Sequence, residues 1–139
     1  MHESGVADDV ERGRGDRRLR AMVAIAPVAM LETTAEGDVS WANHRWYELV
    51  GASSNEPLEK PWFDKVHPDD LVRVLDAWRR GTSERESVSV ECRILAADDS
   101  VRWLHCSATP MVDPSSGIAT YAMIAADVTD KHRLNEMIR

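Results

Sequence analysis

The stretch Trp62-Phe63-Asp64-Lys65-Val66-His67-Pro68-Asp69-Asp70 decides how this chain is organised. Pro68 has a fixed φ and no backbone N–H, so it suits the first turn of a helix. Asp69 and Asp70 then lie at the positive end of the helix dipole, where carboxylates are stabilising. The stretch therefore predicts a helix that begins at Pro68.

The residues that follow continue this helix as far as Arg80. Apolar side chains recur at the spacing i, i+3, i+4 and i+7 of one helical face. They are Leu71, Val74, Leu75 and Trp78. Gly81 comes next and is expected to end the helix.

Upstream of this helix the sequence predicts a β-hairpin and then a short helix. Val28–Thr34 and Asp38–Trp41 are β-prone runs joined by a tight turn. Asn43 can cap the short helix through its side-chain oxygen, and Gly51 can end it in the left-handed conformation. Trp46 is expected on its inner face.

The last third of the chain changes to an alternating pattern. In residues 86–95 apolar side chains alternate with polar ones, which is typical of a strand with one buried face. Residues 101–109 and 118–128 are predicted to be strands as well, and turn-forming residues precede each of them. Three long antiparallel strands after the helices place the chain in the α+β class.

The 139 residues fit one domain with a helix at each end. We expect residues 1–8 to be a disordered tail and residues 9–26 to form an N-terminal flanking helix. Residues 27–128 are the predicted core. Residues 129–139 are predicted to form a C-terminal exit helix, with Thr129 as its cap.

Charge and cysteine content restrict the classes of function. Seventeen basic residues against twenty-four acidic ones give a net charge of −7, which argues against binding to nucleic acid or to an anionic membrane. Two cysteines are too few for a disulfide framework, and no apolar run approaches the roughly 20 residues of a membrane span. We therefore expect a cytoplasmic chain without a membrane segment.

A series of separated motifs resembles those of a PAS domain with its C-terminal PAC motif. Residues 43–51 read N-x-x-W-x-x-x-x-G, and residues 62–70 read W-x(4)-HPDD, as in a bacterial subclass of the family. Arg102-Trp103 and the exit motif Asp127-Val128-Thr129-Asp130 fit as well. One departure is the turn Asp98-Asp99-Ser100, where family members usually carry Asp-Gly.

The resemblance implies a PAS fold, in which a five-stranded antiparallel sheet of order 2-1-5-4-3 is covered by helices on one face. It implies a module that senses a small-molecule or redox cue, or that dimerises, and passes the response through its C-terminal helix. The residues expected to relay the signal are Asp127, Thr129 and Asp130. The output domain would be a histidine kinase or a diguanylate cyclase, in the same chain or on a partner protein. No enzymatic activity is implied, and the alternative is a ligand-free scaffold for protein interactions.

A ligand of a PAS domain would lie between the helices and the inner face of the sheet. The alternation of the strands and the large helix side chains predict the lining of that space. It comprises Trp46, Trp62, Trp78, Val90, Cys92, Ile94, Leu104, Cys106, Ala108, Met123 and Ala125. Because interiors are close-packed, either the aromatic side chains or an unknown small apolar ligand must fill it, and we favour the side chains.

Specific cofactors are argued against. A flavin-adduct photoreceptor of this family needs a reactive cysteine after the first helix, and residues 52–61 contain none. Haem in this family usually needs a histidine on the longer helix, and residues 71–80 contain none. The five histidines lack metal-site spacing, and no nucleophile has a base beside it, so no metal and no catalytic residue is expected. Cys92 and Cys106 could respond to redox, but buried cysteines more often act as small hydrophobes.

The outer face of the sheet is predicted to carry an apolar patch, which in a lone domain marks a partner surface. An apolar stripe on the N-terminal helix could cover it, within one chain or across a symmetric homodimer. The expected interface residues are Leu19, Met22, Val23, Trp103 and Ile124.

Overall fold

The structure is a computed structural model that describes residues 17–18, 28–51, 60–96 and 98–138. The predicted tail 1–8 lies outside the described residues. So does the predicted flanking helix 9–26, apart from Arg17 and Arg18, together with its stripe of Leu19, Met22 and Val23.

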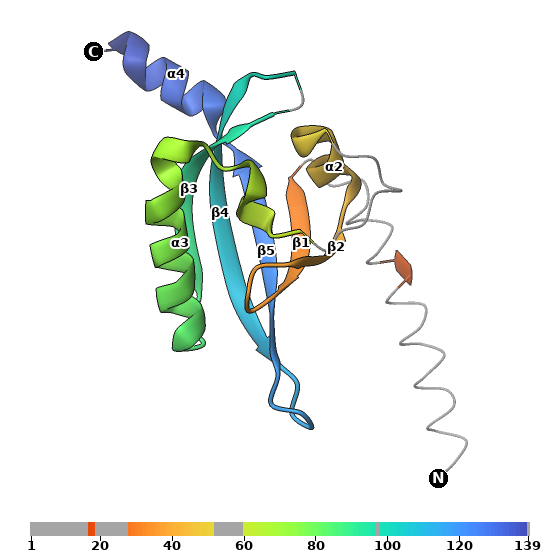
Figure 1. The fold of residues 1–139 in the computed structure, drawn as a ribbon. Coiled ribbons are helices and arrows are strands. Elements are labelled where there is room, and N and C mark those ends of the chain that lie inside the picture. The colour runs from red at the N-terminus through yellow and green to blue at the C-terminus, as the bar shows by residue number, and fades with distance from the viewer. Residues whose placement is uncertain (1–16, 19–27, 52–59, 97, 139) are drawn as a thin grey trace.

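Five strands form one antiparallel sheet (Figure 1). Its order is β2-β1-β5-β4-β3, as the resemblance implies. The strands are β1 (Ala29–Thr34), β2 (Val39–Ala42), β3 (Val88–Leu95), β4 (Val101–Val112) and β5 (Ala119–Asp127). The predicted strands are confirmed, although β4 runs three residues past the expected end at Thr109.

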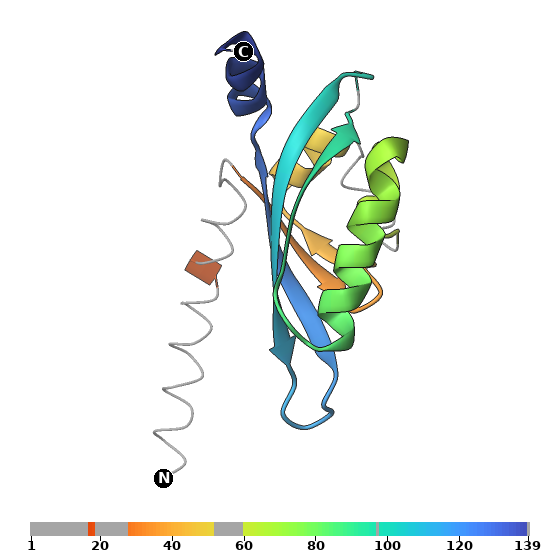
Figure 2. The same ribbon diagram turned by 90° about the vertical axis from the view of Figure 1, so that its left-hand side faces the viewer.

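Among the described residues, three helical segments lie between the strands and one follows them. They are α2 (His44–Val50), the 3-10 helix η1 (Trp62–Lys65), α3 (Pro68–Ser83) and α4 (Thr129–Ile138). Figure 2 shows the sheet from its edge, with α3 covering one face and α4 leaving at one end. The fold class is therefore α+β with a PAS arrangement of strands and helices.

The caps of α2 are confirmed. The Asn43 side chain accepts a hydrogen bond from the backbone N–H of Trp46, and Gly51 closes the helix at a φ of 72°. The Asn43 carboxamide also accepts from Met30 N and donates to the Val28 carbonyl, at 3.0 and 2.9 Å. One side chain thus both starts α2 and fixes it to β1.

The predicted end of α3 is wrong. The helix passes through Gly81 to Ser83, and the chain turns at Arg85, whose φ is 55°. A Cβ atom built on Gly81 would lie 2.4 Å from Cγ2 of Val88. The glycine is therefore explained by the close approach of α3 to β3 and not by a helix end.

We expect Gly81→Ala to lower the free energy of unfolding by about 1 kcal/mol, because overpacking against the stiff Val88 outweighs the gain in helix propensity. In a Val88→Ala background the same change should be stabilising, since the obstructing methyl group is gone. Urea denaturation of the original chain, the two single variants and the double variant measures whether Gly81→Ala destabilises the first background and stabilises the second. Equal effects of Gly81→Ala in both backgrounds would show that the two residues do not interfere.

Alternation along the last three strands places apolar side chains on the inner face, as predicted. The residues are buried at Val88, Val90, Cys92 and Ile94 of β3, at Leu104, Cys106 and Ala108 of β4, and at Tyr121, Met123 and Ala125 of β5. The β3–β4 turn is made without glycine, because Asp99 adopts a φ of 63° and Asp is among the residues that tolerate it. The departure from Asp-Gly therefore leaves the hairpin intact.

Candidate functional site

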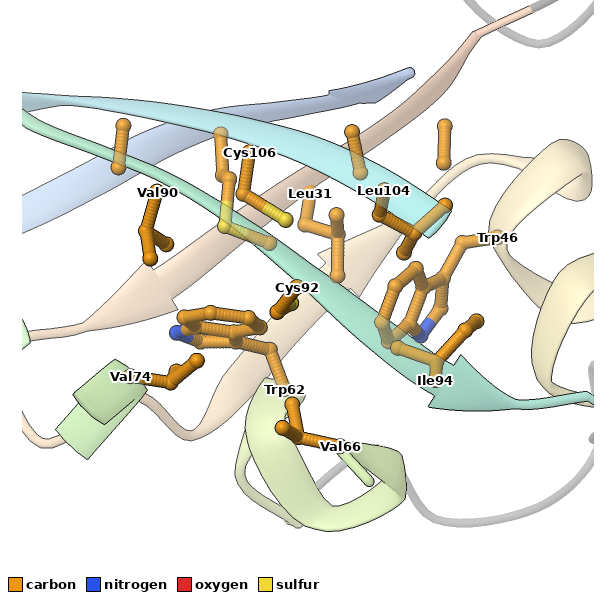
Figure 3. Packing of buried hydrophobic residues seen from close by; sticks show 14 of the residues in the cluster. Leu31, Trp46, Trp62, Val66, Val74, Val90, Cys92, Ile94, Leu104 and Cys106 are labelled. Atoms are coloured by element: carbon orange, nitrogen blue, oxygen red, sulfur yellow. The ribbon is translucent and has the colours of Figure 1, made fainter. Parts of the chain in front are cut away.

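The predicted lining residues form one cluster between the helices and the sheet. Each of them is buried, and all of them belong to the same core. They are Trp46, Trp62, Trp78, Val90, Cys92, Ile94, Leu104, Cys106, Ala108, Met123 and Ala125. Figure 3 shows Trp46 and Trp62 pointing from their helices toward the strand side chains.

Large aromatic rings fill much of the space over the inner face. The Trp62 and Trp78 rings meet at an angle of 72° with centroids 5.6 Å apart. The Trp78 and Tyr121 rings follow at 5.2 Å. Alternation places Tyr121 on the inner face, but its part in this aromatic row could not be predicted without the spatial arrangement. The three rings form a continuous series from η1 through α3 to β5.

Two polar atoms in this series have no hydrogen-bond partner among the residues that the structure describes. They are the indole nitrogen Nε1 of Trp62 and the hydroxyl of Tyr121, on residues that are 2% and 0% exposed. The indole N–H of Trp78, in contrast, donates to the Ala35 carbonyl at 3.0 Å. Leaving a buried polar group unpaired costs about 1–3 kcal/mol, so a bound molecule that paired these atoms would be stabilised.

Burial also affects the ionisation of Tyr121. Removal from water raises the pKa of its phenol, because the charged form is the one that burial disfavours. The hydroxyl is therefore a neutral group near pH 7, able to donate one hydrogen bond and to accept others.

The carboxylate of Asp70 lies in the first turn of α3, as predicted, and it also has a partner on β3 that the sequence did not predict. Asp70 is 5% exposed, and Arg93 of β3 holds it with three hydrogen bonds, from the backbone N–H and from Nε and Nη2, at 2.8, 3.0 and 2.7 Å. These hydrogen bonds from Arg93 lower the pKa of Asp70 to about 2. The same contact raises the pKa of Arg93. Asp70 thus fastens α3 to the outermost strand in addition to its place in the first turn.

The start of α3 is capped by His67. Its Nδ1 accepts the backbone N–H of Asp69 at 3.1 Å, and the backbone N–H of His67 donates to the Arg93 carbonyl at 2.8 Å. This explains the histidine as a structural residue of the helix start.

The thiols of Cys92 and Cys106 are 0% and 2% exposed and belong to neighbouring strands. Hydrogen bonding with Cys106 lowers the pKa of Cys92. The same bond and burial raise the pKa of Cys106. Buried thiols in apolar surroundings are inert, so the pair acts here as packing.

The exit motif joins the end of the sheet to α4. The Asp127 carboxylate accepts the Thr129 backbone N–H at 2.9 Å, and the Thr129 hydroxyl accepts the Trp103 N–H at 2.9 Å. The prediction that Thr129 caps its own helix is therefore wrong, because its hydroxyl is engaged by β4 and Asp127 performs the capping. Arg102 lies 3.5 Å from the same carboxylate, and Asp130 is exposed in the first turn.

The predicted outer patch is less open than expected. The indole of Trp103 stacks on the imidazole of His132, with centroids 3.9 Å apart and planes 10° from parallel. Ile124 remains 47% exposed in the middle strand of the sheet. Trp103 is thus partly covered by the chain's own exit helix, which the prediction did not foresee.

The described part of the chain contains neither a metal-binding cluster nor a membrane-spanning helix. It holds no cluster of three or more His, Cys, Asp or Glu side chains suited to a metal ion. None of its helices is long and apolar enough to cross a bilayer.

The chain was compared with known proteins. An uncharacterised protein of Sinorhizobium fredii, y4lL, is 24% identical over 140 aligned residues, which cover 95% of this chain and 17% of the relative. The peroxide stress-activated histidine kinase mak1 of Schizosaccharomyces pombe is 25% identical over 114 residues, which cover 81% of this chain and 7% of the kinase. The chain therefore spans less than a fifth of the length of these relatives.

A solved structure shows the fold, and a family model shows the family. A PAS domain from Colwellia psychrerythraea superposes with a TM-score of 0.71 at 17% identity, and the match covers 82% of this chain and 97% of that one. The family model described as the PAS fold matches residues 39–125, which is more than half of the chain. Together with the strand order and the helices over one face of the sheet, this match shows that the chain belongs to the PAS family.

Proposed function

We propose that this PAS domain is a sensory module that binds a small neutral molecule between its helices and its sheet. The observation that carries this proposal is a pair of buried polar atoms, Trp62 Nε1 and the Tyr121 hydroxyl, for which the described part of the chain offers no hydrogen-bond partner. Trp78 contacts both rings, so the two atoms belong to one aromatic series. An oxygen atom of a ligand could accept the indole N–H and thereby remove its desolvation penalty.

The lining restricts the class of ligand. The core cluster consists of apolar side chains, and the nearby carboxylate of Asp70 is already neutralised by Arg93. An unpaired charge would be strongly disfavoured in these surroundings. We therefore propose a small molecule with an apolar body and one or two uncharged oxygen atoms.

The response would leave the domain through α4. Asp127 and Thr129 fix the point where β5 ends and the helix begins, and Asp130 lies in its first turn. A changed helix orientation is a shift in population between two arrangements. The output would be a histidine kinase or a diguanylate cyclase, in the same chain or on a partner. The similarity to the histidine kinase of Schizosaccharomyces pombe supports a histidine kinase.

We propose that the module works in the cytoplasm.

The proposal also includes a homodimer of this module. We propose that the outer face around Ile124, together with the flanking stripe of Leu19, Met22 and Val23, forms the contact between two copies. Ile124 is an exposed apolar side chain, and such side chains mark partner surfaces. A redox cue at Cys92 and Cys106 is the less favoured trigger, because an oxidant in solvent reaches neither sulfur without opening of the core.

Nuclear magnetic resonance of the ¹⁵N-labelled chain tests ligand binding. The five tryptophans give five indole N–H signals, and Trp62→Phe identifies the signal of Trp62. Titration with 1-propanol, a neutral molecule with one oxygen, should shift the Trp62 signal in a saturable way. The Trp41 signal serves as an internal control, because this residue is 40% exposed and lies outside the core cluster. Propionate, which has a similar size but carries a charge, should leave the Trp62 signal unchanged.

A ligand-free scaffold is the alternative, and the same titration separates it from the sensor. If the Trp62 signal moves linearly and in parallel with that of Trp41, the alcohol acts as a solvent only. That result would contradict the sensory proposal and favour a domain that works through its surfaces.

A further inference from the structure

Two residues from the beginning of α4 hold this helix against the sheet. Thr129 is 3% exposed and accepts the backbone N–H of Trp103. His132 lies one turn further, and its ring stacks on the indole of Trp103. The apolar side chains beyond this turn are exposed, at Leu134, Met137 and Ile138. The direction in which α4 leaves the sheet therefore depends on the contact between His132 and Trp103.

Glu91 of β3 supports this contact. Its carboxylate is hydrogen-bonded to Nε2 of His132, and it also lies 3.3 Å from Nδ1 of His105. The hydrogen bond with His132, above all, lowers the pKa of Glu91. The imidazole of His132 is thus held on two sides, by an aromatic ring and by a carboxylate.

Trp103 is in turn connected, through Arg93, to helix α3 on the other face of the sheet. It pairs in register with Arg93 of β3, whose guanidinium carbon lies 5.4 Å from the centre of the indole ring. The same guanidinium forms two hydrogen bonds with Asp70 in the first turn of α3. Arg93 can make both contacts because β3 is the outermost strand, so its side chain reaches around the edge of the sheet.

We infer that Asp70, Arg93, Trp103 and His132, which we call the edge chain, couple α3 to α4 around the edge of β3. The sheet backbone separates the inner layer from the outer face, and this row of contacts passes beside it. A displacement of α3 moves Asp70, and the paired guanidinium follows it. The Trp103 ring then loses or gains its cation–π partner while it stacks on His132. The docking of α4 changes as a result.

A merely structural role would make these contacts independent of one another. Asp70 would then stabilise α3, and His132 would stabilise α4, with additive effects on each helix. A coupled chain predicts that the effects do not add, because removing one link already disconnects the others. The distinction does not require a ligand, so it is separate from the sensory proposal.

Amide hydrogen exchange of α4 in the full 139-residue chain tests the coupling. Arg93→Lys keeps the charge but loses the two-pronged contact with Asp70 and the planar contact with Trp103. We expect this variant and His132→Ala each to speed exchange of the α4 amides by about three- to ten-fold. Asp70→Asn, which touches α4 nowhere, should do the same. The slowest amides of β4 and β5 report global unfolding and allow its contribution to be subtracted.

The double variant and the control decide the outcome. In Asp70→Asn/His132→Ala the α4 exchange should be no faster than in His132→Ala alone. Asp69→Asn changes the neighbouring, exposed carboxylate and should leave α4 as it is in the original chain. The inference is overturned if Asp70→Asn and Arg93→Lys both match Asp69→Asn, or if the effects of Asp70→Asn and His132→Ala multiply.

Discussion

Replacing Trp78 with alanine is expected to lower the free energy of unfolding by about 3–5 kcal/mol, the range found when a large aromatic side chain is removed from a core. Trp78 is 2% exposed and stands between Trp62 and Tyr121, so its loss removes a packing contact from both rings. The substitution also leaves the Ala35 carbonyl without its indole donor. Urea denaturation monitored by circular dichroism measures the change.

Trp41→Ala is the matched control for this prediction. Trp41 is 40% exposed on β2, so removing it should lower the free energy of unfolding by no more than about 1 kcal/mol. Trp78→Phe should lie between the two, because it keeps most of the packing and loses the hydrogen bond. Similar losses for Trp78→Ala and Trp41→Ala would mean that the aromatic series does not form the centre of the core.

Asp70→Asn should lower the free energy of unfolding by about 2–3 kcal/mol at pH 7. Arg93 lowers the pKa of Asp70 from an ordinary value of 3.8 to about 2, which corresponds to about 2 kcal/mol. The carboxylate side chain is 7% exposed, so solvent screens the contact little. The variant also leaves the Arg93 guanidinium without its charged partner, which adds to the loss.

The free energy of unfolding that this ion pair contributes depends on pH. Because the folded-state pKa is depressed, the stabilisation is fully present above the ordinary value near 4 and is lost as the pH falls toward about 2. The stability curves of the original chain and of Asp70→Asn should therefore converge in acid. Asp69→Asn, whose carboxylate is 76% exposed, should change stability at pH 7 by less than about 0.5 kcal/mol. A constant difference between the Asp70 variant and the original chain from pH 7 to pH 2 would contradict the ion pair.

Local patterns of the sequence were sufficient for the five strands, for the starts of α2 and α3, and for the buried face of the sheet. Alternation along β3, β4 and β5 identified the inward side chains, since successive side chains of a strand point to opposite faces of the sheet. The proline and the acidic pair identified the start of α3, and Asn43 identified the start of α2. These features depend on neighbours within a few residues, which the sequence displays directly.

The functional contacts depend on residues that are distant in the chain. Asp70 and Arg93 are separated by 23 positions, and His132 and Glu91 by 41, so neither pair has a local signal. Its place in the first turn of α3 explains Asp70 without any partner in the local sequence. The predicted role of Gly81 is wrong for the same reason, since its neighbour Val88 belongs to another element. The unpartnered atoms of Trp62 and Tyr121 likewise become visible when the whole core is assembled.

We propose that occupation of the core changes how α4 is docked. Amide hydrogen exchange of residues 129–138 can be measured without 1-propanol and at the concentration that saturates the Trp62 indole signal. We predict that exchange in α4 changes by at least about threefold, whereas amides of the distant turn 113–118 stay the same. A saturated Trp62 signal with unchanged exchange in α4 would contradict the claim.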